Sequence, residues 1–398
     1  MRQAKRRRLN QASILRLCPM SFDVDLFHAM GLSRLAHDLK NQGRSIIHME
    51  FGQPSTGAPA AAIAAAHHAL DTDPGGYTEG PALKTRLSKH YAQTYGVEVS
   101  PDRIWLTCGA SPALVLALAS QFEAGARIAM ARPGYVAYRN TVKALKMTPV
   151  EIACGAEVGF QLTAAALAAL DPPPAGVIIA SPANPTGTVI DPAEMAAIAA
   201  LCAERGIRIV SDEIYHGLTY EAPARSMLEF TEQCLVVNSF SKYFSMVGWR
   251  LGWLVAPADQ VRTVHAFGAN MFLTAPSLSI AAGLVAMDCA EELQGHVETY
   301  RANRALLLDA LPALGLTAIA PPDGAFYIYA DIGHLTNDSM AFCERLLRDT
   351  GVVAAPGIDH DPVDGHRFIR FSFAVSTDLV REAIARLIPW FTAQGARA

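Results

Sequence analysis

A single lysine, Lys242, stands in the mostly apolar stretch "SFSKYFSMVGWRLGW", with Arg250 a short way downstream. An amine in apolar surroundings beside another cation has a lowered pKa, so more of it is neutral and nucleophilic. The bland alternative is a solvated lysine lining a turn, which would be a poor nucleophile. The stretch therefore indicates a lysine that can react with a carbonyl group.

Four further groups of polar residues each follow a short apolar run. Asp212 begins "DEIYHG", Asn184 lies in "SPANPTG", Tyr135 lies in "RPGYVAY", and Gly109-Ala110-Ser111 precede an apolar helix whose free amides could bind phosphate. Each motif alone is an ordinary turn or cap signal. Together they match the needs of pyridoxal 5′-phosphate, which takes an amine at its aldehyde, a carboxylate at its pyridine nitrogen, and amides, hydroxyls and an arginine at its phosphate.

The elements that must position these residues are short β-branched strands alternating with Ala/Leu-rich helical stretches. The strand candidates are "RIWLT", "RIAMA", "GVIIA", "IRIVS", "CLVVN" and a weaker sixth, "GWLVA". This alternation predicts an α/β fold with a mainly parallel sheet flanked by helices. Ligands of such sheets bind beyond the carboxyl ends of the strands, where the polar groups would converge.

Composition narrows the classes of partner. The chain has 398 residues, 51% of them hydrophobic, and a net charge of −4, so neither nucleic acid nor an anionic membrane is expected as its partner. Seven cysteines without a C-x-x-C spacing favour a reducing compartment over disulfides or zinc. We expect a cytoplasmic protein that binds small molecules and no metal.

The amino terminus, "MRQAKRRRLNQASILRLCPMSF", is basic and has no acidic residue before Asp23. We interpret residues 1–19 as a disordered extension, or as sequence upstream of a true start at Met20. A mitochondrial presequence is the alternative, and an interrupted apolar run argues against a secretory signal.

From about Ser33 onward the ordered set of motifs resembles the class I/II aminotransferases, which are pyridoxal-phosphate enzymes of fold type I. The resemblance implies that Lys242 forms the Schiff base with the cofactor and that Asp212 faces its pyridine nitrogen. It also implies that Asn184 and Tyr215 reach the phenolic oxygen of the cofactor. Tyr135 would stack on the ring, with Tyr138 a weaker candidate, and the phosphate would be bound by Gly109, Ala110, Ser111, Ser239, Ser241 and Arg250.

The same resemblance assigns the substrate and a partner subunit. Arg370 in "HRFIRFSFA" is at the position that binds the α-carboxylate, helped by Asn184 and by the backbone of Gly52. Arg367 is its neighbouring competitor, but strand alternation puts the two on opposite faces. Tyr77 would reach the phosphate of the partner subunit's cofactor, which implies a homodimer with shared active sites.

The resemblance further implies a seven-stranded sheet in a large cofactor-binding domain over residues 56–290. A smaller α/β domain would combine residues 20–55 with residues 291–398, and the helix through "ELQGHVETYRANRALLLDAL" would join the two. The expected reaction is transamination with ping-pong kinetics, in which the Lys242 amine moves the α-proton.

Departures from the family pattern bear on specificity. Ser111 stands where family members that act on aspartate through one known route carry a lysine, so a neutral or aromatic donor is favoured. The family's aromatic-glycine pair is replaced by "IDHDPVDG" after Gly357. A C–S β-lyase on the same scaffold is the alternative function, and a non-catalytic cofactor-binding regulator is the second.

Overall fold

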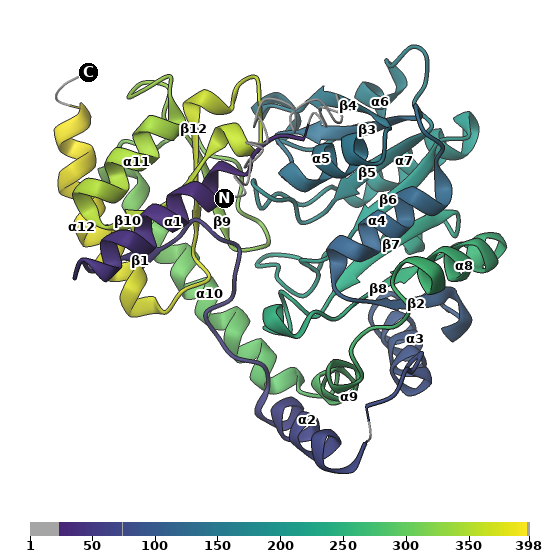
Figure 1. The fold of residues 1–398 in the computed structure, drawn as a ribbon. Coiled ribbons are helices and arrows are strands. Elements are labelled where there is room, and N and C mark those ends of the chain that lie inside the picture. The colour runs from purple at the N-terminus through teal and green to yellow at the C-terminus, as the bar shows by residue number, and fades with distance from the viewer. Residues whose placement is uncertain (1–23, 74, 396–398) are drawn as a thin grey trace, which may run out of the picture.

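The computed structural model describes residues 24–73 and 75–395, so the predicted extension over residues 1–19 lies outside the described residues. Two groups of sheets form the framework of Figure 1. The larger sheet has seven strands in the order β2-β8-β7-β6-β5-β3-β4. Its strands are β2 (Ile104–Thr107), β3 (Arg127–Arg132), β4 (Thr148–Ala153), β5 (Gly176–Ala180), β6 (Arg208–Asp212), β7 (Cys234–Ser239) and β8 (Gly252–Val255).

The seven-stranded sheet is mainly parallel, as the sequence predicts. Only β8 runs against its neighbours, pairing antiparallel with both β2 and β7. Register places Ala180 beside Asp212, and Gly252 between Thr107 and Ser239. The ends of β2, β5, β6 and β7 therefore share one edge, and the residues that follow them meet there.

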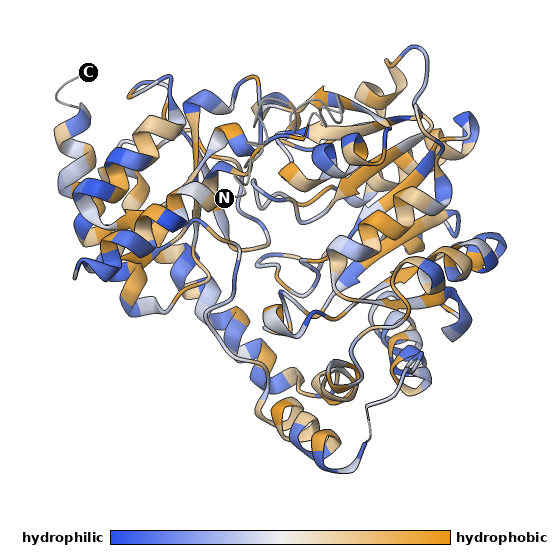
Figure 2. Ribbon diagram, in the orientation of Figure 1, coloured by the Kyte–Doolittle hydropathy of each residue, from blue (hydrophilic) through white to orange (hydrophobic). Residues whose placement is uncertain are grey.

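Helices cover both faces of this sheet because its strands are apolar on both faces (Figure 2). Alternate residues of β6 illustrate this, since Ile209 packs into one hydrophobic cluster and Val210 into the other. The helices around the sheet are α3 (Pro81–Tyr95), α4 (Ala110–Gln121), α5 (Val136–Ala144), α6 (Ala164–Ala168), α7 (Pro192–Arg205), α8 (Val261–Met271) and α9 (Ser277–Ala286), and α2 (Ala60–Thr72) packs against α9.

Apart from the two clusters on the faces of the large sheet, a further hydrophobic cluster is built from both ends of the chain (Figure 1), and we call it the second cluster. Strand β1 (Ile47–His48) pairs parallel with β10 (Val352–Val353), and a three-stranded sheet has the order β11-β12-β9. Its strands are β9 (Tyr327–Asp331), β11 (Ala355–Pro356) and β12 (Phe368–Ser372), and its helices are α1 (His28–Asn41), α11 (Ser339–Thr350) and α12 (Thr377–Gly395).

One long helix, α10 (Ala290–Ala310), runs between the two clusters. Leu293 packs into the hydrophobic cluster of the large sheet that contains Ile209, whereas Val297, Tyr300 and Leu307 pack into the second cluster. The helix covers the stretch for which the sequence predicts a long connecting helix; the exact domain boundaries stay a prediction. No helix among the described residues is long and apolar enough to span a membrane.

Candidate active site

A cavity of about 370 Å³ opens at the shared edge of the large sheet and is closed on its other side by the second cluster. The cavity is lined by the segments that follow five strands of the large sheet and by the end of β6. Residues from the amino-terminal and carboxyl-terminal parts of the chain complete the lining. Of the residues that the sequence predicts for the site, it contains Gly52, Ala110, Ser111, Tyr135, Asn184, Asp212, Tyr215, Ser241, Lys242, Arg250 and Arg370.

Lys242 lies just beyond β7, and its Nζ donates to the backbone carbonyl of Gly52 at 2.5 Å. The side chain keeps some contact with solvent through the open cavity. Desolvation by the surrounding protein, helped by the charges of Arg370 and Arg250 and partly opposed by Asp212, lowers its pKa to about 8. The amine is thus much easier to deprotonate than a solvated lysine, as its apolar sequence context predicts.

Asp212 ends β6 and points its carboxylate into the cavity. Burial raises its pKa, while the Tyr138 hydroxyl, which donates to Oδ2 at 2.6 Å, and the amide of Ile214, which donates to Oδ1 at 3.1 Å, act in the other direction. Tyr138 is edge-on to Tyr135, with ring centroids 5.5 Å apart. Tyr138 is therefore a partner of the carboxylate, a contact that its sequence position does not reveal.

The first turn of α4 and Arg250 form a concentrated positive corner. No side chain caps the amides at the start of α4, and Ala110 and Ser111 line the cavity there. Arg250, held at a positive φ of 54°, donates to the carbonyls of Val247 and Cys108. A Cβ on Gly109 would lie 2.4 Å from the Arg250 guanidinium, so only glycine lets the two approach. The corner is suited to an anion.

Arg370 on β12 enters the cavity from the second cluster and is almost fully buried. Its Nη1 donates to Oδ1 of Asn184 at 2.6 Å, and its Nη2 donates to the carbonyl of Glu50. Among the described residues no carboxylate lies within ion-pair distance of it. The structure therefore places an uncompensated guanidinium charge in the cavity, where it can attract a carboxylate.

Tyr327 on β9 is a cavity residue that the sequence reasoning missed. Its hydroxyl lies 2.6 Å from the hydroxyl of Tyr215, and its ring lies under Arg370, 4.4 Å from the guanidinium carbon. A Cβ on Gly52 would lie 1.7 Å from the Tyr327 hydroxyl, which explains why glycine is needed there. The motif "GAFYIYAD" offers two tyrosines on one strand face, Tyr327 and Tyr329, and no sequence signal separates them.

Four residues of interest lie outside the cavity lining. Ser239 is buried behind it, where its hydroxyl accepts from the amide of Ser241, and Gly109 lies next to Arg250. Tyr77 is 84% exposed and lines a second, larger groove. Arg367 pairs with Asp331 at 2.6 Å and is absent from the cavity, so Arg370 alone of the two arginines reaches it.

The segment that carries "IDHDPVDG" contacts both the amino-terminal helix and the large sheet. Asp359 accepts from the amides of His28 and Ala29 at the start of α1, at 2.7 and 2.8 Å. His360 accepts through its carbonyl from the amide of Gly134, next to Tyr135, and Asp361 lies 3.4 Å from Arg132. The departure from the family pattern thus fixes Phe27 and the Tyr135 turn at the cavity mouth.

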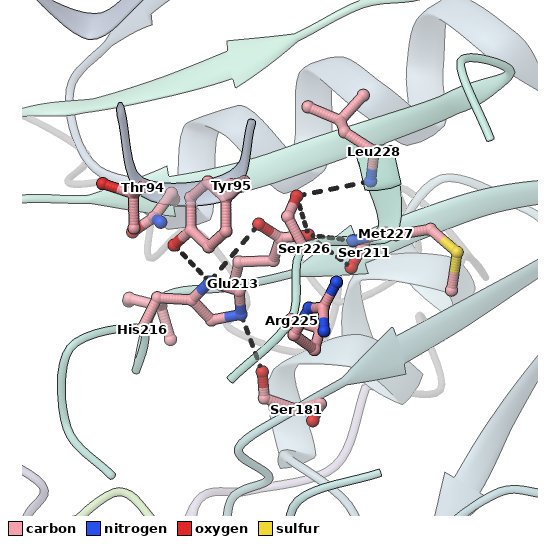
Figure 3. A network of polar contacts seen from close by, with 12 residues as sticks. Thr94, Tyr95, Ser181, Ser211, Glu213, His216, Arg225, Ser226, Met227 and Leu228 are labelled. Atoms are coloured by element: carbon pink, nitrogen blue, oxygen red, sulfur yellow. Dashed lines mark hydrogen bonds and ion pairs between the residues drawn. The ribbon is translucent and has the colours of Figure 1, made fainter. Parts of the chain in front are cut away.

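Glu213, next to Asp212, does not line the cavity and belongs to a buried polar network (Figure 3). Its Oε1 accepts from Ser211, Ser226 and the amide of Met227, while burial raises its pKa to about 8. Nε2 of His216 donates to the Ser181 carbonyl, so Nδ1 accepts from Tyr95 at 2.7 Å. Burial lowers the pKa of His216 to about 3, so its 3.6 Å contact with Glu213 is not an ion pair.

Comparisons with known proteins agree with this architecture. The family described as "Aminotransferase class I and II" matches residues 44–387. The chain is 44% identical to the valine–pyruvate aminotransferase of Mycobacterium tuberculosis over 93% of this chain and 97% of that protein.

Two solved structures show the same fold. An aminotransferase from Mycobacterium tuberculosis has a TM-score of 0.91 at 43% identity, covering 93% of this chain and 98% of that one. The aspartate aminotransferase from Thermus thermophilus with maleate has a TM-score of 0.85 at 29% identity, covering 92% and 97%.

Proposed function

The chain belongs to the class I and II aminotransferases, and we propose that it moves the amino group of a neutral L-amino acid with an apolar side chain to a small 2-oxo acid. The observation that carries this choice is the charge of the cavity. Its basic lining residues are Lys242, Arg250 and Arg370, and each has a task in the proposed reaction. None is left, among the described lining residues, to bind a second carboxylate on the substrate.

The remaining wall supports an apolar side chain. Phe27 and Phe51 meet edge-on at the mouth, with ring centroids 6.5 Å apart, and Ile214 and Val247 also line the cavity. A pocket of this kind gains about 0.8 kcal/mol for each buried methylene of the substrate, and it disfavours an unpaired carboxylate. The 44% identical relative named valine–pyruvate aminotransferase supports an aliphatic donor and pyruvate as the acceptor.

We propose pyridoxal 5′-phosphate as the cofactor because the residues present fit its groups. The uncapped start of α4, with Gly109, Ala110 and Ser111, would bind the phosphate together with Ser241 and Arg250, and Ser239 would hold Ser241 in place. Asp212, buried beside the cavity, would keep the pyridine nitrogen protonated, and Tyr135 would support the ring. When bound, this cofactor supplies an aldehyde carbon and an electron-accepting ring.

Lys242 would attach the cofactor and afterwards carry the proton between the substrate α-carbon and the cofactor. Its lowered pKa of about 8 leaves roughly half of the amines neutral at pH 8, against well under 1% for a solvated lysine. The Gly52 carbonyl, 2.5 Å from Nζ, limits where the amine can point. Asn184 and Tyr215 would donate to the phenolic oxygen of the cofactor.

Arg370 would bind the substrate α-carboxylate, which supplies the missing negative charge beside the buried guanidinium. Asn184 already contacts Arg370 at 2.6 Å, so the two sides of the cavity meet at this point. The substrate carboxylate would lie between them and the backbone of Gly52. This arrangement orients the α-carbon toward Lys242.

We also propose a homodimer in which Tyr77 serves the partner subunit's site. Tyr77 is 84% exposed, and the groove that it lines reaches Arg250 and Val247, which also border the cavity. Leu70, 61% exposed, lines the same groove. A second copy covering this face would bury these apolar groups. Light scattering should report a dimer, and Tyr77→Phe should weaken cofactor affinity without changing the mass.

The test of the proposed function is a donor screen read by absorbance and product analysis. The purified protein, loaded with pyridoxal 5′-phosphate, is mixed with valine, alanine, phenylalanine, aspartate or glutamate singly. Loss of the cofactor's visible band with formation of the matching 2-oxo acid is expected for the apolar donors first. Preference for aspartate would contradict the proposed specificity. Release of ammonia and pyruvate from a cysteine S-conjugate, added in a separate sample because it carries the thiolate leaving group that the other donors lack, would favour the C–S β-lyase.

A further inference from the structure

Tyr327 connects the two sides of the cavity through a single side chain. Its hydroxyl is 2.6 Å from that of Tyr215, and its ring lies 4.4 Å from the guanidinium carbon of Arg370. All three side chains are at most 5% exposed, so solvent does not weaken these contacts. The group assigned to the cofactor oxygen and the group assigned to the substrate carboxylate therefore share one neighbour.

The direction of the hydrogen bond between the two hydroxyls follows from counting protons. Each tyrosine hydroxyl carries one proton. If Tyr215 directs its proton to the phenolic oxygen of the cofactor, it can only accept from Tyr327. Among the described residues Tyr215 is the hydrogen-bond partner of the Tyr327 hydroxyl, so Tyr327 has its proton available for this purpose.

The packing around Tyr327 restricts it to this position. Gly52 leaves the space that its hydroxyl occupies, since a Cβ there would lie 1.7 Å away. Its ring is edge-on to both Tyr215 and Phe326, with centroids 5.7 and 5.2 Å apart. The same Gly52 presents its carbonyl to Lys242, so the tyrosine is fixed against the backbone that also orients the lysine.

We propose that Tyr327 is a positioning residue of the transamination, whose hydroxyl polarises Tyr215 and whose ring orients Arg370. The inference rests on the proposed function, in which Tyr215 serves the cofactor and Arg370 serves the substrate. A hydroxyl that accepts a hydrogen bond becomes a stronger donor to its own acceptor. Tyr327 thus helps to stabilise negative charge on the phenolic oxygen, while its π face limits the guanidinium to one plane.

The first test removes only the hydroxyl, with Tyr327→Phe, and titrates the visible absorbance of the bound cofactor against pH. A weaker donor at the phenolic oxygen stabilises its negative charge less, so the neighbouring proton is held more tightly. The titration midpoint should rise by about half a unit to one unit. The ring is retained, so the KM for the amino acid should stay within about twofold.

Tyr329→Phe is the matched control. Tyr329 lies on the same strand and is equally buried, but its hydroxyl has no hydrogen-bond partner among the described residues and lies outside the cavity. Its loss should leave the titration unchanged. An equal shift in both variants would mean a general packing effect and would overturn the inference.

A double-mutant cycle with Tyr215→Phe tests whether the Tyr327 hydroxyl acts on the cofactor through Tyr215. Tyr215→Phe alone should raise the midpoint further than Tyr327→Phe, and adding Tyr327→Phe to it should change nothing more, because the acceptor is gone. Additive shifts would overturn the inference. A Tyr327→Phe protein that titrates like the wild type would do the same.

The ring is tested separately with Tyr327→Leu. The KM for the donor amino acid should rise about 5- to 30-fold, which is the loss expected for a desolvated cation–π contact. An unchanged KM would remove the ring from the inference. A wild-type protein that neither binds the cofactor nor transfers amino groups would refute the proposed function itself. If the wild type does both, and Tyr327→Phe and Tyr327→Leu behave like the wild type, only the role of Tyr327 is refuted.

Discussion

Asp212 and Glu213 are adjacent carboxyl groups in opposite surroundings. Both are buried, and in both cases burial is the main cause that raises the pKa. Asp212 faces the cavity that contains Lys242. Glu213 lies outside the cavity lining and accepts three hydrogen bonds, from the hydroxyls of Ser211 and Ser226 and the amide of Met227. A shifted pKa therefore marks both residues, and only the open space in front of Asp212 distinguishes a group available for chemistry from one that supports the fold.

The largest expected effect lies on the cavity side of this comparison. Lys242→Ala should retain the fold and still bind pyridoxal 5′-phosphate noncovalently, but turnover should fall at least about 10⁴-fold because both the attachment and the proton transfer are lost. Steady-state kinetics and the cofactor spectrum measure this. Turnover near the wild-type value would refute the assignment of Lys242.

Asp212→Asn keeps the shape of the side chain and removes its charge. We expect kcat/KM to fall about 10²- to 10³-fold, the typical loss for one preorganised electrostatic group. Glu213→Gln is the matched control, one position along, and should stay within about tenfold of the wild type. Equal losses in the two variants would erase the distinction between the two carboxyl groups.

Glu213→Ala tests the supporting side. The change leaves the hydroxyls of Ser211 and Ser226 and the amide of Met227 without their acceptor, which should lower the free energy of unfolding by about 2–4 kcal/mol. Denaturant unfolding of the cofactor-loaded protein measures this, at one fixed cofactor concentration. A stability loss below 1 kcal/mol would show that the network contributes little.

The stability of the fold should also depend on pH. The folded pKa of Glu213, about 8, lies above its usual 4.5, so its contribution to stability is complete below about pH 4.5 and is lost as the pH rises to about 8. Gln cannot ionise, and the stability of Glu213→Gln relative to the wild type should rise across this window. His216, with its pKa lowered to about 3, has the opposite slope between about pH 3 and 6.5.

The strands of the large sheet were predictable because continuous apolar runs mark strands buried on both faces. The structure contains all six candidate strands within a residue or two at each end. It adds the edge strand β4, "TPVEIA", whose proline and glutamate hide the pattern. The convergence of Asn184, Asp212 and Lys242 follows from the rule that strand ends share an edge, whereas their proposed roles rest on the family resemblance.

Contacts between distant segments were beyond the reach of the sequence. Tyr327 and Tyr329 have the same strand parity, yet only Tyr327 lines the cavity, because Gly52 from the opposite end of the chain leaves space for it. Asp359 likewise finds its partners at the start of α1. No local sequence pattern indicates either contact, because each joins residues that are far apart in the sequence and meet only when the second cluster folds.

The pairing of β1 with β10 has a consequence for synthesis. Ile47 must wait for Val352, roughly 300 residues later, before its strand can form. At a translation rate of about 5–20 residues per second, that delay is roughly 15–60 s. During this interval the apolar face of α1, with Leu32, Ala36 and Leu39, lacks its partners from the carboxyl-terminal part of the chain. The nascent chain thus exposes an aggregation-prone apolar helix face, and binding by a chaperone would protect it until translation ends.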